Sequence, residues 1–166
     1  MRRRASSTSV QARRQLDAFL DRYTDDIAAA TRRALRELRR RVPGATEMVY
    51  DNYNALAIGF GPGDKVAEAV FSIVAYPRWV TLFFLQGARL ADPDKVLKGR
   101  GSRVRHIVLA DPKVIASAPV EALIAQALRA AKVPIDPRRR RSLVIKSVSA
   151  RQRPRRPAAA SAGSRK

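Results

Sequence analysis

The sequence predicts an α+β fold: an antiparallel sheet of about five strands packed against a long N-terminal helix and a C-terminal helix. Apolar residues recur at helical spacing at the two ends of the segment formed by residues 10–133. Between them lie short runs of β-branched and aromatic residues, separated by turn residues. Because helices flank the strands instead of alternating with them, the order of elements is typical of this class.

The N-terminal helix is predicted over residues 10–42. Its apolar positions, which run from Leu16 to Leu38, occupy one arc of about 100° on a helical wheel, the width of a face that packs on a core. Thr24-Asp25-Asp26 is a good helix start inside this range, so the pattern also allows a break at Thr24. Pro43-Gly44 ends the helix.

The central region changes to the periodicity of strands. Strands are predicted over residues 48–50, 56–60, 70–76, 80–85 and 103–109, and the C-terminal helix over residues 119–132. Pro77-Arg78-Trp79 separates two of these strands and predicts a tight hairpin connection.

The positive charge is concentrated at the two ends of the chain. The net charge is +20, but residues 47–131 carry only ten basic and eight acidic residues, whereas residues 132–166 carry twelve basic residues and one acidic residue. We therefore predict a disordered basic N-terminus (1–9), one domain (10–133) and a basic, Arg/Pro/Ala-rich, mostly disordered tail (134–166). The short apolar segment Leu143-Val144-Ile145 interrupts this tail and could dock on the domain.

Composition excludes several kinds of site. The 166 residues include no cysteine, which rules out disulfides, thiolate metal sites and a cysteine nucleophile, and fits a reducing, cytoplasmic location. No secretory signal and no run long enough to cross a membrane is present, so no membrane association is predicted. His106 is the only histidine, which excludes a cluster of histidine ligands.

One regular acidic row is the candidate metal site. Asp17, Asp21 and Asp25 are spaced at four-residue intervals on the predicted helix and would offer oxygen ligands to a cation. The competing interpretation is a solvated helix face, which the neighbouring Arg14 and Arg22 favour.

The pocket candidates are aromatic, basic and histidine side chains of the strand region: Tyr50, Tyr53, Trp79, Arg105 and His106. Aromatic residues in short strands also occur in cores, and a mid-strand histidine is often structural. No catalytic motif is present, which favours a protein without enzymatic activity, although a site built from Arg105, Tyr50 and Glu47 stays open.

A family resemblance extends from about residue 42 to residue 128. The stretches PGATEMVYDNYNALAIGF, LFFLQGARL, DPDKVLKGRG and RVRHIVL resemble the YdhG-like family, a domain of unknown function. The resemblance implies a compact α+β protein. One branch of the family is described as a frataxin-like iron chaperone, and Asp17, Asp21 and Asp25 would be the matching iron ligands. Many members carry a methionine-proline step where this chain has YDNYNAL.

Two functions follow as hypotheses. The first is a non-enzymatic cytoplasmic module that binds a small ligand, a metal such as iron, or a protein partner. The alternative is a nucleic-acid-associated protein that binds non-specifically through its basic ends.

Overall fold

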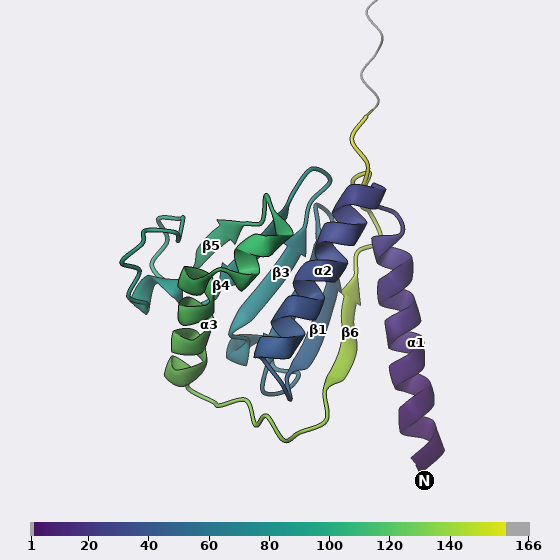
Figure 1. Ribbon diagram of the computed structural model, residues 1–166. Helices are drawn as coiled ribbons and strands as arrows, with labels where there is room; N and C mark the ends of the chain where they lie inside the picture. The colour runs from purple at the N-terminus through teal and green to yellow at the C-terminus, as the bar shows by residue number, and fades with distance from the viewer. Residues whose placement is uncertain (1, 159–166) are drawn as a thin grey trace, which may run out of the picture.

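A computed structural model describes residues 2–158 of the protein. The helices are α1 (Arg2–Leu20), α2 (Asp25–Arg41) and α3 (Ala118–Ala130), and the strands are β1 (Thr46–Asp51), β2 (Leu56–Gly61), β3 (Phe71–Ala75), β4 (Val80–Phe84), β5 (Arg105–Val108) and β6 (Ser142–Val148). Short 3-10 turns lie at Val66–Glu68, Gly87–Arg89 and Pro112–Ala116. The strands form one six-stranded sheet in the order β5-β4-β3-β2-β1-β6. Figure 1 shows α2 and α3 on one face of this sheet and α1 alongside β6.

A row of aliphatic side chains crosses the sheet and forms the centre of the core. Val49, Ile58, Ile73, Leu82 and Ile107 are successive partners across β1 to β5, and all five are buried. Burying each such side chain contributes about 1.5–3 kcal/mol. The predicted α+β class is confirmed, and β1 to β5 pair antiparallel, but the sheet has six strands and not about five.

The N-terminal helical segment is two helices and not one long helix, and the break falls at Thr24, as the sequence pattern allowed. The break lies at residues 21–24, where Thr24 has extended backbone angles (φ −60°, ψ 154°) before α2 begins. Tyr23 is buried in this turn; its hydroxyl donates to the Ala75 carbonyl at 2.8 Å and accepts from the Leu56 amide at 3.1 Å. Because a buried hydroxyl needs such partners, the turn that places Tyr23 against β2 and β3 is favoured over a continuous helix.

The first residues of the chain also differ from the prediction. Helix α1 begins at Arg2, so residues 2–9, predicted as disordered, continue the helix. Extending an existing helix requires no new nucleus and therefore costs little, even where the composition is polar. Met1 lies outside the described residues.

The predicted disordered tail is corrected for residues 134–158. Residues Ser142–Val148 form β6, which pairs in parallel with β1, and Leu143 and Ile145 pack against the core. Helix α1 contacts β6. The composition of a segment predicts whether that segment can bury a core of its own. It does not predict whether the segment can pair with the edge of an existing sheet, because such a strand needs only a few apolar side chains. Residues 159–166 lie outside the described part of the chain.

Gly44→Ala is expected to lower the free energy of unfolding by at least about 1–2 kcal/mol, because Gly44 has a positive φ of 81°. A Cβ atom there would also lie 2.0 Å from the Asp136 carbonyl oxygen, in the segment that leads to β6. Urea denaturation measures the loss. The matched control is Gly63→Ala, since a Cβ at Gly63 has no neighbour within 4 Å. Equal stability of the two variants would show that the Asp136 segment does not lie against Gly44.

Candidate functional site

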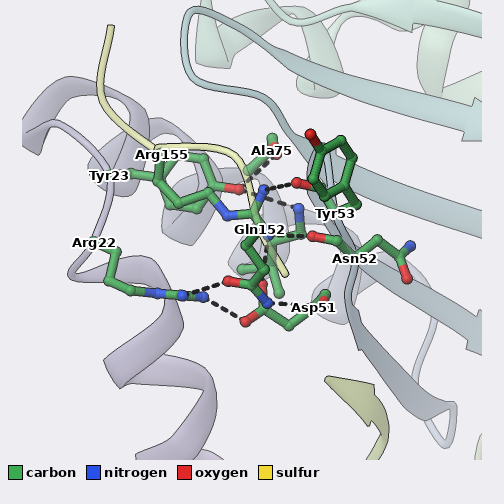
Figure 2. Close-up of polar contacts among 9 residues, drawn as sticks. Arg22, Tyr23, Asp51, Asn52, Tyr53, Ala75, Gln152 and Arg155 are labelled. Atoms are coloured by element: carbon green, nitrogen blue, oxygen red, sulfur yellow. Dashed lines mark hydrogen bonds and ion pairs between the residues drawn. The ribbon is translucent and has the colours of Figure 1, made fainter. Parts of the chain in front are cut away.

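A buried carboxylate at the end of β1 anchors the C-terminal segment, as Figure 2 shows. Asp51 is fully buried. One of its oxygens accepts from Arg155 Nη2 at 2.8 Å, and the other accepts from Arg22 Nη2. Arg155 comes from the segment after β6 and Arg22 from the turn between α1 and α2. This ion pair therefore joins three parts of the chain, and we call Asp51, Arg22 and Arg155 the Asp51 anchor.

Arg155 is held from several sides. Its side chain is only 2% exposed, and its guanidinium also donates to the Asn52 and Tyr53 carbonyls. It lies 5.8 Å from the centre of the Tyr23 ring. Burial raises the pKa of the Tyr23 hydroxyl above its usual value, and the nearby Arg155 charge opposes part of that rise. A guanidinium buried in this way is tolerated because a carboxylate and carbonyl oxygens share its protons.

Backbone and amide contacts continue the attachment along the loop between β1 and β2. The Ser149 amide donates to the Asp51 carbonyl at 2.9 Å, and the Arg153 amide donates to the Tyr53 carbonyl at 2.9 Å. Gln152 Nε2 donates to the Asp51 carbonyl at 3.0 Å. Residues 149–155 are thus fixed against the domain.

The anchored segment forms one wall of a surface groove of about 580 Å³, within the range of about 300–1,000 Å³ that small-molecule sites occupy. The opposite wall is the turn between β3 and β4. We call this cavity the arginine–aromatic groove; it is lined by Asn54, Tyr76, Pro77, Arg78, Trp79, Arg153, Pro154, Arg156, Pro157 and Ala158.

Two stacked aromatic rings lie in the groove. Tyr76 and Trp79 have ring centres 4.9 Å apart with 27° between their planes, and the Tyr76 amide donates to the Trp79 carbonyl at 2.9 Å. Trp79 is 46% exposed. Beside the groove, Tyr53 is 47% exposed, and the Arg153 guanidinium lies 5.5 Å from its ring centre. Large aromatic surface is therefore available to a ligand.

The charge of the groove is positive and unneutralised. Within residues 2–158, Arg78, Arg153 and Arg156 form no ion pair with an acidic side chain, and no carboxylate lines the groove. This differs from Arg155, whose charge is balanced by Asp51. Arginine side chains without a carboxylate partner remain free to pair with anionic groups of a ligand.

The five pocket candidates from the sequence do not form one pocket. Trp79 lines the groove, and Tyr53 contacts Arg153 next to it. Arg105 instead donates to the Gly101 and Val104 carbonyls, and His106 lies with its ring centre 5.5 Å from that of Phe83. Both belong to β5, at the opposite edge of the sheet from β6.

Tyr50 and Glu47 are also engaged elsewhere. The Tyr50 hydroxyl is buried, with no hydrogen-bond partner in the described chain, and this burial raises the pKa of the hydroxyl above its usual value. Glu47 is 1% exposed and pairs with Arg39 at 2.7 Å and Arg141 at 3.4 Å. Neither residue lines the arginine–aromatic groove.

The acidic row does not fit a metal site. Asp17 and Asp21 both face Arg32, at 3.9 and 2.8 Å, and Asp25 lies beyond the break, at the start of α2. In the part of the chain that the structure describes, no group of three acidic, histidine or cysteine side chains could hold a metal ion. The residues present therefore do not form the iron site that the YdhG-like resemblance implies.

Sequence reasoning missed Asp51 and Gln152. It assigned the arginines of the C-terminal segment to a mostly disordered tail that binds nucleic acid non-specifically. The one available signal was Leu143-Val144-Ile145, which lies in the first half of β6, the strand that brings the following residues to the groove. Searches of protein-family models, curated proteins and solved structures each found no match to this chain. Among residues 2–158, no helix combines the length and the apolar character needed to cross a membrane.

Proposed function

We propose that this chain is a nucleic-acid-binding module whose arginine–aromatic groove binds phosphate groups. The observation that supports the proposal most strongly is the convergence of Arg78, Arg153 and Arg156 on one cavity without a carboxylate partner. Arginine pairs well with phosphate because its planar guanidinium donates two parallel hydrogen bonds. Pairing also releases the counterions that surround a nucleic acid, which favours binding at low salt.

The anchored segment explains why the groove is a better candidate for a nucleic-acid-binding site than a basic tail would be. A disordered basic tail attracts any polyanion, since clustered charge is sufficient for weak attraction. Here Arg155 is held by Asp51, so the neighbouring Arg153 and Arg156 are held beside the Tyr76–Trp79 pair. Arginines held in place lose less conformational entropy on binding than arginines of a mobile tail.

We also propose a family and a cellular location for this chain. The stretches that resemble the YdhG-like family support membership of that family. The lack of a catalytic motif and of cysteine supports a non-enzymatic, cytoplasmic binding role. Iron binding has less support, because Asp17 and Asp21 face Arg32 and Asp25 lies on a separate helix. The groove itself is lined by arginines and no carboxylate, so it suits the phosphates of a nucleic acid better than a metal ion.

The double variant Arg153→Gln/Arg156→Gln tests the proposal through the salt dependence of binding. Binding of a fluorescent oligonucleotide is measured between about 0.05 and 0.3 M salt. We expect weaker binding, and a slope of log affinity against log salt that is smaller by about 1 to 1.5, because about two phosphate contacts are lost.

The matched control is Arg138→Gln/Arg140→Gln, which removes the same charge. These arginines precede β6 and the groove residues follow it, so the seven residues of the strand, about 20 Å, separate them. The control should reduce affinity much less. Equal losses in the two double variants would assign binding to general charge, and no saturable binding by the unmodified protein would contradict the proposed function.

A further inference from the structure

We infer that the ligand of the groove is a single-stranded nucleic acid, with an unpaired base stacked on Trp79; this inference rests on the proposed function. Phosphate contacts alone would suit a duplex and a single strand equally well. The aromatic side chains distinguish the two, since the faces of bases are covered in a duplex and accessible in a single strand.

The Tyr76–Trp79 pair is built as a stacking surface. Its hairpin is closed by the Tyr76 amide, and the stacked Tyr76 ring fixes the orientation of the Trp79 ring. Trp79 nevertheless leaves 46% of its surface in solvent, which is unusual exposure for the largest apolar side chain in the protein. A ring that is already oriented loses little freedom when a base stacks on it.

The cations lie where a strand bound in this way would carry its phosphates. Arg78 lies between Tyr76 and Trp79 in the sequence of the hairpin, and Arg153 and Arg156 form the opposite wall. Tyr53, against which Arg153 packs, directly precedes the groove residue Asn54 and offers a second exposed ring. A groove lined by both aromatic rings and arginines suits the bases and the phosphates of a single strand.

A base inside a duplex could reach the Tyr76–Trp79 stacking surface only by being extruded from the helix. Extrusion costs a few kcal/mol for a paired base and much less for an unpaired one. The expected preference for single strands therefore comes from the stacking surface, while the salt dependence comes from the arginines. These two contributions can be measured separately.

Trp79 is the only tryptophan, so its fluorescence reports directly on stacking. The full chain is titrated with a single strand of about 12 nucleotides, as RNA and as DNA, and with the matching duplexes. We expect the single strand to quench the emission saturably, with the Kd found by anisotropy, and to bind more tightly than its duplex. Comparing RNA with DNA shows which of the two the groove prefers.

Trp79→Ala should weaken single-strand binding by about 5- to 150-fold without changing the salt slope, whereas duplex binding should change little. Trp79→Phe keeps a ring and should retain most of the affinity. Urea denaturation of both variants separates a binding defect from unfolding.

Three outcomes would overturn the inference. If duplex and single strand bind equally and Trp79→Ala changes neither, while the Arg153/Arg156 variant still reduces the salt slope, the proposed function stands and the single-strand inference fails. If a mononucleotide binds as tightly as the oligonucleotide, the ligand is a free nucleotide and not a strand. If no nucleic acid binds, the proposed function and the inference fail together.

Discussion

Asp51→Ala is expected to lower the free energy of unfolding by about 3–5 kcal/mol. The substitution leaves the Arg155 guanidinium buried, at 2% exposure, without its counter-charge. It also removes the carboxylate that pairs with Arg22, which then keeps its hydrogen bond to Gln152. Removing one member of a buried pair costs far more than the pair contributes, because the remaining charge stays desolvated. Urea denaturation measures the change.

Two controls make this prediction specific. Asp94→Ala removes an exposed carboxylate and should change stability by less than about 0.5 kcal/mol. The double variant Asp51→Ala/Arg155→Met should recover part of the loss, since no buried charge is then left without a partner. A loss below about 1 kcal/mol for Asp51→Ala would show that Arg155 is not buried against the domain.

A chain that ends at Val133 is expected to be less stable than the full chain by more than the Asp51→Ala loss. Such a chain lacks β6, so the edge of β1 loses its partner strand and α1 loses a surface on which it packs. Glu47 also loses Arg141 and Asp51 loses Arg155, which leaves two buried carboxylates with fewer partners. Urea denaturation and hydrogen exchange of the β1 amides measure the effect.

The control is a chain that ends at Ala158, which retains β6 and the Asp51 anchor. Its urea midpoint is the reference, so that the difference between the two shortened chains measures the contribution of residues 134–158. If the chain that ends at Val133 is equally stable, residues 134–158 add nothing to the fold, and the domain boundary predicted from composition is right.

The successful predictions concern patterns that are complete within a short segment. Val120, Leu123 and Ile124 repeat at helical spacing, and α3 buries all three. Pro77-Arg78-Trp79 separates two β-branched runs, and β3 and β4 meet there as a hairpin. Local spacing is sufficient in these cases because each element presents one apolar face to the core.

The unsuccessful predictions concern segments whose structure depends on distant partners. Arg155 looks like part of a solvated basic tail until Asp51, more than a hundred residues earlier, accepts its hydrogen bond. Thr24-Asp25-Asp26 allowed a break in the N-terminal helix, but the hydrogen bonds of Tyr23 to Ala75 and Leu56 that accompany this break were not predicted. Neither partner can be identified from spacing along the chain.

The residues of the candidate site were likewise predicted only in part. Trp79 was identifiable from the sequence as an aromatic residue in a hairpin, whereas Arg153 and Arg156 were assigned to a tail without structure. What brings them together is β6, which carries the C-terminal segment along β1 to the groove.

Local pattern and composition therefore determine the α+β class, the hairpin that bears Trp79 and the excess of positive charge at the C-terminal end. Tertiary structure decides that this charge is folded onto the domain and that part of it faces a stacked aromatic pair. The physical reason is the buried Asp51 carboxylate, which is stable only when guanidinium groups from other parts of the chain reach it.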